Sequence, residues 1–185
     1  GNGIEIELNT TGESINADQV LLATGRVPNT DILDVAATGI EMDGRGFVRV
    51  NNYLETNVEG TWALGDIAGI KPLKHTAVRE AKHVVRNVFL NERSPMRYET
   101  IPHAVFTSPQ IAAVGKTEDE LKSEGVPYKV GRHRFKDTAM GMALREDRLV
   151  KVLASNSDEL LGCHIVGPNT SILIQEAVVA MNTTG

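Results

Sequence analysis

The stretch that most constrains the fold is residues 61–69, Thr-Trp-Ala-Leu-Gly-Asp-Ile-Ala-Gly, which is soon followed by Leu73-Lys74-His75-Thr76-Ala77. This order predicts a buried strand, a Gly-Asp at its carboxyl end, a glycine-bearing loop and a helix start. Gly65 lets a ligand come close to the backbone, and Asp66 supplies an acceptor-only carboxylate. The helix start offers unpaired N–H groups and a positive dipole end. The order is suited to a cofactor site, and the alternative is that Asp66 only caps the loop.

The composition is typical of a soluble globular chain. Its 185 residues suffice for one large domain or two small ones, with 41% hydrophobic and 23% charged residues. The net charge of −5, without a basic run, argues against a nucleic-acid partner, and no apolar run approaches membrane-spanning length. The single cysteine, Cys163, lies in an apolar run, which favours a packed core thiol over a reactive one. Cysteine usage predicts a reducing, cytoplasmic setting.

The first half of the chain predicts α/β structure. Apolar runs and alternating runs predict strands over residues 4–8, 18–24, 46–50 and 61–64. The continuous apolar run 18–24 is typical of a central strand that is covered on both faces. From Thr76 to Asn91 the apolar residues recur at helical spacing, and we expect the charged residues between them, including Glu80, to form the polar face of this helix.

The second half predicts a separate α+β module that begins near residues 98–102. An extended apolar segment over residues 103–114 is interrupted by Pro109, and Thr117 with Glu120 forms a capping box at a helix start. Three further strands are expected, over residues 128–135, 148–154 and 160–166. The chain then enters an apolar helix over residues 172–181, which needs burial on several sides, and part of this burial is expected from another subunit.

Several catalytic and binding motifs are missing from the sequence. It contains no Gly-x-Gly-x-x-Gly, no P-loop and no Cys-x-x-Cys. Its five histidines do not have a metal-ligand spacing, so metal binding is not expected. His103, between Pro102 and an apolar strand, is either structural or functional, with the structural reading favoured. The residues alone therefore indicate half of a cofactor site joined to an α+β module.

Four ordered segments carry a resemblance to a known family, the pyridine nucleotide-disulfide oxidoreductases. This family includes dihydrolipoamide dehydrogenase, glutathione reductase, mercuric reductase and mycothione reductase. The resemblance covers nearly the whole chain, and Leu73-x-His75-x-Ala77 is most similar to the dihydrolipoamide and mycothione branches. The four segments are residues 22–29, 56–66, 102–118 and 162–168.

The resemblance implies two cofactors, FAD and NAD(P). By it, Asp66 accepts hydrogen bonds from the ribityl chain of FAD, and backbone amides around residues 73–75 face the pyrimidine edge of the flavin. Gly25 closes on the nicotinamide dinucleotide, and Val105 lies near the nicotinamide. The resemblance implies no catalytic residue in this chain. It gives these cofactor-binding residues: Gly25, Arg26, Gly65, Asp66, Pro72, Leu73, Lys74, His75 and Val105.

The resemblance also implies a domain organisation and a function. Residues 1–24 are expected to end an NAD(P)-binding domain, residues 25–99 to form a central FAD-binding segment, and residues 100–185 to form an α+β interface domain that makes a homodimer. The expected function is that of a fragment of an FAD-dependent, NAD(P)-linked dithiol/disulfide oxidoreductase, most similar to dihydrolipoamide dehydrogenase. The alternatives are a mycothione or mercuric reductase-like parent, or a non-catalytic dimerisation or partner-binding module.

The same resemblance places the family's redox-active cysteine pair upstream of Gly1 and its catalytic His-Glu pair downstream of Gly185. The chain alone is therefore expected to be inactive. The identity of the small dithiol or disulfide substrate, and the choice between NAD and NADP, depend on residues outside the sequence.

Overall fold

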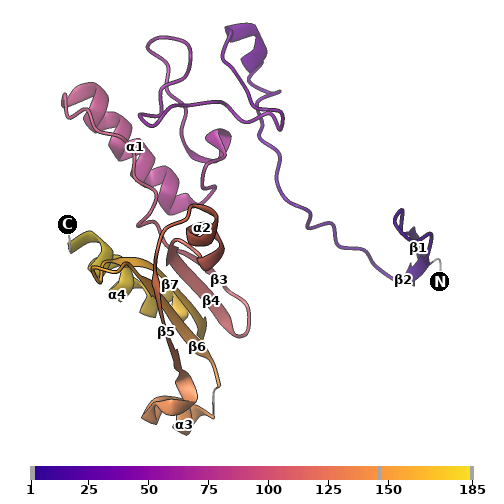
Figure 1. The fold of residues 1–185 in the computed structure, drawn as a ribbon. Helices are drawn as coiled ribbons and strands as arrows, with labels where there is room; N and C mark the ends of the chain where they lie inside the picture. Colours follow the sequence, from indigo (N-terminus) through magenta and orange to yellow (C-terminus); the bar gives the residue numbers. More distant parts are fainter. Residues whose placement is uncertain (1–2, 146, 184–185) are drawn as a thin grey trace.

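The computed structural model describes residues 3–145 and 147–183 and has a mixed α/β architecture. Figure 1 shows an N-terminal hairpin apart from the rest, an irregular central segment that leads into a long helix, and a sheet that carries the other helices. The elements in chain order are β1 (Ile4–Glu7), β2 (Ser14–Ala17), η1 (Val35–Thr38), η2 (Gly65–Ala68), α1 (Lys74–Phe89), β3 (His103–Val105), β4 (Gln110–Gly115), α2 (Glu118–Ser123), β5 (Lys129–Arg134), η3 (Phe135–Asp137), α3 (Ala139–Leu144), β6 (Leu149–Ala154), β7 (Leu160–Gly167) and α4 (Thr170–Thr183).

The N-terminal region confirms one predicted strand and contradicts another. Strands β1 and β2 pair antiparallel, with Ile4 opposite Ala17. Residues 18–24, predicted to be a central covered strand, are not in a strand, and Leu21 is 88% exposed. A strand needs neighbours for its N–H and C=O groups. In Figure 1 the extended stretch that follows β2 runs alone between the hairpin and the central segment, so it has no sheet to join.

The central segment has less regular structure than predicted. Residues 46–50 form only an isolated bridge between Val48 and Met42, and residues 61–64 only a bridge between Trp62 and Glu55. The predicted strands over both ranges are therefore wrong. The segment is instead held by loops around buried side chains, among them Val48 and Leu54. The helix predicted from Thr76 to Asn91 is confirmed as α1, which begins two residues earlier.

The second half contains a five-stranded antiparallel sheet with the strand order β3-β4-β7-β6-β5. The strands predicted near residues 128–135, 148–154 and 160–166 are confirmed as β5, β6 and β7. Helix α4 packs on β4 and β7, and the core between them contains Ala112, Val114, Cys163, Ile165 and Ile174. Burying these apolar side chains is the main force that holds the helix on the sheet.

Two local predictions about this domain have different outcomes. The capping box is confirmed, because Thr117 Oγ1 accepts from the Glu120 amide while Glu120 Oε2 accepts from the Thr117 amide at 2.7 Å. Ile172 and Val179 on the outer face of helix α4 are largely exposed in this single chain, so the expected burial by another subunit stays a prediction.

Within residues 3–145 and 147–183, no helix has the length and apolar character that a membrane span requires.

Candidate functional site

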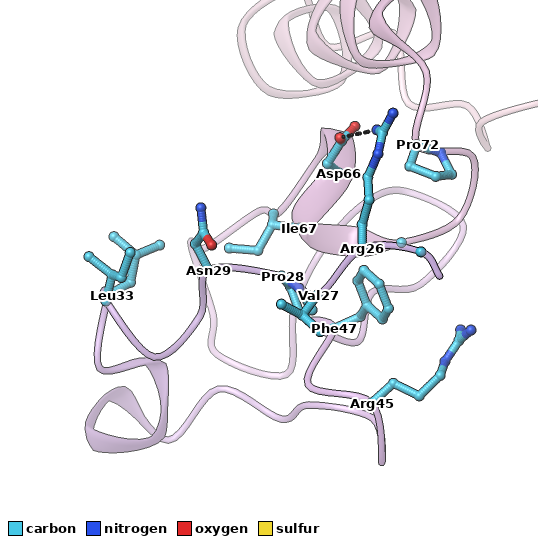
Figure 2. Close-up of a pocket in the computed structure, with 13 residues that line it drawn as sticks. Arg26, Val27, Pro28, Asn29, Leu33, Arg45, Phe47, Asp66, Ile67 and Pro72 are labelled. Atoms are coloured by element: carbon cyan, nitrogen blue, oxygen red, sulfur yellow. Dashed lines mark hydrogen bonds and ion pairs between the residues drawn. The ribbon is translucent and has the colours of Figure 1, made fainter. Parts of the chain in front are cut away.

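A cleft of about 1040 Å³ opens in the central segment, beside the Gly65-Asp66 turn. Figure 2 shows its lining, which comes from the extended chain after β2, the loop before Val48, helix η2 and the loop before α1. Its walls are mostly apolar, as is usual for small-molecule sites. The lining residues are Gly25, Arg26, Val27, Pro28, Asn29, Ile32, Leu33, Arg45, Phe47, Asp66, Ile67, Gly69 and Pro72.

Asp66 presents its carboxylate to this cleft from the first turn of η2. Its Oδ2 accepts a hydrogen bond from Arg26 Nη1 at 3.1 Å, and both side chains remain more than half exposed (Figure 2). An ion pair this exposed contributes little to stability, of order 0–1 kcal/mol. The second oxygen, Oδ1, is not used in that bond, so the carboxylate can still accept from a ligand hydroxyl.

Gly65, directly before Asp66, is held by a residue that sequence reasoning placed on the wrong side of its helix. Glu80 of α1 is 1% exposed, and its Oε2 accepts from the Gly65 amide at 2.6 Å. The prediction that Glu80 lies on the polar outer face is therefore wrong. Glu80 lies four residues after Thr76 and shares its buried face, but both are polar residues, so the hydrophobic pattern of the helix did not mark this face as buried.

The start of α1 lies next to the cleft in sequence and leaves its first amides uncapped. Leu73 is the N-cap residue, no side chain caps the helix, and the first turn contains no acidic residue. Unpaired N–H groups at such a start attract electron-rich groups. The His75 ring is already occupied, because its Nε2 lies 2.7 Å from the Pro102 carbonyl oxygen and can donate to it.

The predicted site residues therefore fall into three groups. Four of them line the cleft together: Gly25, Arg26, Asp66 and Pro72. Four others lie close in sequence to lining residues, at the N-terminal ends of η2 and α1, but are not part of the lining: Gly65, Leu73, Lys74 and His75. Val105 lies in β3 of the sheet domain, about half exposed, away from the cleft lining. The structure adds the apolar walls, including Phe47 and Ile67, which sequence reasoning did not single out.

The titratable groups outside the cleft are suited to structural roles. Burial raises the pKa of the Cys163 thiol, and desolvation together with the charge of Lys71 lowers the pKa of His103. His164 lies in β7 with its Nε2 3.0 Å from the Lys116 carbonyl oxygen. In the part of the chain that the structure describes, no three His, Cys, Asp or Glu side chains gather as metal ligands do.

The structure contains an α/β segment with a cleft, joined to an α+β sheet domain, and comparison with known proteins shows the family of both parts. Two protein-family models match the sequence. The family model for pyridine nucleotide-disulphide oxidoreductases matches residues 1–81, and the model for the dimerisation domain of the same family matches residues 101–185. The chain belongs to the pyridine nucleotide-disulphide oxidoreductase family. Members of this family are oxidoreductases that use FAD and NAD(P).

Curated relatives and solved structures agree with this assignment. The chain is 42% identical to dihydrolipoyl dehydrogenase of Cupriavidus necator over 91% of its own length and 36% of the relative. It is 39% identical to mycothione reductase of Mycobacterium tuberculosis over 98% of its length and 41% of that protein. The crystal structure of LpdA from Mycobacterium tuberculosis matches 99% of this chain and 40% of its own with a TM-score of 0.88 at 26% identity. The chain thus spans about two fifths of the length of these relatives.

Proposed function

We propose that this chain forms the central flavin-binding segment and the interface domain of an FAD-dependent, NAD(P)-linked oxidoreductase that acts on a small dithiol or disulfide. The observation that carries the proposal is the cleft, where the Asp66 carboxylate meets an apolar pocket beside the uncapped start of α1. We assign residues 25–99 to the flavin segment and residues 100–185 to the interface domain, with residues 1–24 as the end of the NAD(P)-binding domain.

The residues present fit the flavin. Asp66 offers a carboxylate acceptor that remains largely exposed, which is suited to the hydroxyls of a ribityl chain. Lys74 and His75 offer backbone amides at a helix start, which favour negative charge on a nearby ring edge, whereas the Leu73 amide already donates to the Lys71 carbonyl at 2.8 Å. When bound, FAD supplies the electron-accepting ring, while the protein supplies binding, orientation and electrostatics. The imidazole of His75 already contacts the Pro102 carbonyl, so His75 acts here through its backbone.

The nicotinamide side of the proposal rests on fewer contacts. Gly25 lines the cleft with φ at +122°, a backbone conformation that favours glycine and leaves room for a ligand. Arg26 brings a positive charge to the same wall, and Val105 is accessible on β3. We propose that Gly25 and Val105 approach the nicotinamide dinucleotide when the complete NAD(P)-binding domain is present.

The interface domain supports a homodimer. Residues 101–185 match a dimerisation domain, and apolar side chains are exposed on it at Phe106 of the β3–β4 turn and at Ile172 and Val179 of α4. Apolar surface of this kind is typical of a protein–protein contact. We propose that two copies associate through residues after Thr100, that the protein works in the cytoplasm, and that nucleic acid and membranes are not its partners.

Among the branches of the family we favour the dihydrolipoyl dehydrogenase type, with the mycothione reductase type as the second candidate. The identity of 42% to one named relative and 39% to the other supports this order. The test is to purify the full gene product that contains these 185 residues and to assay NAD-linked oxidation of dihydrolipoamide beside NADPH-linked reduction of a mycothiol-type disulfide. Faster dihydrolipoamide oxidation is expected. Faster mycothiol disulfide reduction would reverse the order, and a flavin-free protein inactive in both assays would favour a non-catalytic dimerisation module.

A further inference from the structure

We propose that Glu80 is a positioning residue that holds the Gly65-Asp66 turn in its ligand-binding geometry and ties this turn to the segment that leads into the interface domain. The inference rests on the proposed flavin site, since it concerns how that site is held. Glu80 belongs to α1 and lies 15 residues after Gly65 in sequence, yet the two residues are in direct contact.

Both carboxyl oxygens of Glu80 are used, and each reaches a different part of the chain. Oε2 accepts from the Gly65 amide at 2.6 Å, and Oε1 accepts from the Tyr98 hydroxyl at 2.7 Å. The Glu80 side chain is almost completely buried. A buried polar side chain is costly unless it is paired, so losing either hydrogen bond is unfavourable. The two bonds join η2, α1 and the loop that contains Tyr98.

The bond to Gly65 acts where the backbone most needs support. Gly65 has φ at +76°, and it is the first residue of η2, a 3₁₀ helix of about one turn that also contains Asp66. A short 3₁₀ turn is marginally stable by itself. Helix α1 places Glu80 beside this turn, and the Glu80 carboxylate accepts from its first amide, that of Gly65. Without that acceptor the turn can change its backbone angles, and the Asp66 carboxylate then loses its fixed position in the cleft.

The bond to Tyr98 continues the connection toward the sheet. Burial and the neighbouring Glu80 carboxyl raise the pKa of Tyr98 far above its usual range, so its hydroxyl stays a donor at every working pH. Two further bonds hold the segment around Tyr98: Lys71 Nζ, in the loop before α1, donates to the Tyr98 carbonyl at 3.0 Å, and His75 Nε2, in α1, lies 2.7 Å from the Pro102 carbonyl oxygen just before β3. If the segment around Tyr98 moves, Glu80 moves with it, and the Gly65-Asp66 turn that Glu80 holds is displaced as well.

The test compares variants of the full gene product, with FAD removed and with FAD added. In Glu80→Ala we expect the Gly65 amide to lose its protection from hydrogen exchange and FAD to bind about tenfold more weakly, the size expected when a charge-assisted hydrogen bond is lost. Glu80→Gln keeps an amide oxygen that can accept from Gly65, so it restores most of both properties. Glu92→Ala removes an exposed carboxylate that pairs with Arg86 and serves as the matched control, with no change expected.

A folded Glu80→Ala variant that protects Gly65 and binds FAD like the unaltered protein would overturn the proposal. If that variant does not fold, Tyr98→Phe decides, because it removes only one hydroxyl: faster exchange at Gly65 supports the proposal and unchanged exchange overturns it. Hydrogen exchange is measured without FAD, so this result stands whether or not the protein binds the flavin. A wild-type protein that protects Gly65 but takes up no FAD would contradict the proposed function and leave the positioning role of Glu80 intact.

Discussion

Individual residues of this chain differ in whether they are placed to bind a ligand or to stabilise the fold. Asp66 and Cys163 are the clearest contrast. Asp66 is exposed at a cleft and has one oxygen outside its ion pair, whereas Cys163 is buried in the core between the sheet and α4. The burial of Cys163 was predicted correctly, because a cysteine within an apolar run is a local pattern, whereas the cofactor role of Asp66 stays a prediction. Glu80 was misplaced, because its partner residues are 15 and 18 positions away and no local pattern shows them.

The reactivity of Cys163 tests its assignment as a core residue. Burial raises the pKa of its thiol, and only the thiolate reacts with disulfide reagents. We expect the native chain to react slowly with an aromatic disulfide reagent at pH 8 and to react fully once it is unfolded in guanidinium. The same measurement after Cys163→Ser gives the background. Native labelling as fast as that of the unfolded chain would show that the thiol is accessible and that the core assignment is wrong.

The helices and strands of this chain differ in how well their own local sequence predicts their secondary structure. Helix α1, the capping box and strands β5 to β7 were predicted from periodicity and turn residues, since their partners are close in sequence or supplied by the same domain. The strand predicted over residues 18–24 is wrong, because an apolar run forms a covered strand only when neighbouring strands exist. The central strands over 46–50 and 61–64 failed for a related reason, since each finds only a single bridge.

Helix α2 is anchored to the sheet by a carboxylate whose charge gives a pH-dependent prediction. Lys151 donates to Glu118 Oε2 at 3.0 Å, and Arg132 donates to the same oxygen. The hydrogen bond from Lys151, aided by the charge of Arg132, holds the pKa of Glu118 below its usual 4.5. A carboxyl with a lowered native pKa stabilises the fold above its unfolded pKa, and this contribution is lost as pH falls through the native value.

We therefore expect Glu118→Gln to lower the free energy of unfolding at pH 7 and to make it less dependent on pH below about 4.5, where the wild-type contribution of this group is lost. Urea unfolding at a series of pH values measures this. Asp119→Asn, at a 97% exposed side chain on the same helix, is the control and should follow the wild-type curve. Identical pH dependence in Glu118→Gln and wild type would show that the anchor contributes nothing.

At the scale of the whole molecule, two features point to surfaces that this chain does not cover itself. Leu21 and Leu22 are exposed in the extended stretch after β2, and Ile172 and Val179 are exposed on α4. We attribute the first to contact with an NAD(P)-binding domain and the second to a second copy of the chain. The family's fold and its dimerisation domain could be predicted from four ordered segments, whereas no local pattern shows what these exposed side chains contact.

Sedimentation of the full gene product tests the second contact. Ile172 and Val179 are seven positions apart on α4 and so share one face. Replacing both by aspartate should convert a dimer into a monomer, because charges on a buried contact lose their hydration without gaining a partner. Ile4→Asp, at an exposed apolar residue of the N-terminal hairpin, should leave the dimer intact. A wild-type protein that is monomeric at all concentrations would contradict the homodimer.

The most direct test of the central claim is a titration of the full gene product with FAD, comparing the unaltered protein with Asp66→Ala. If this chain supplies the ribityl-binding carboxylate, the unaltered protein binds FAD and Asp66→Ala binds it about 10- to 100-fold more weakly, as expected for hydrogen bonds to a charged group. Asp31→Ala, an exposed carboxylate outside the cleft lining, should bind like the unaltered protein. An unaltered protein that takes up no FAD, or an Asp66→Ala variant with undiminished affinity, would contradict the assignment of this cleft as a flavin site.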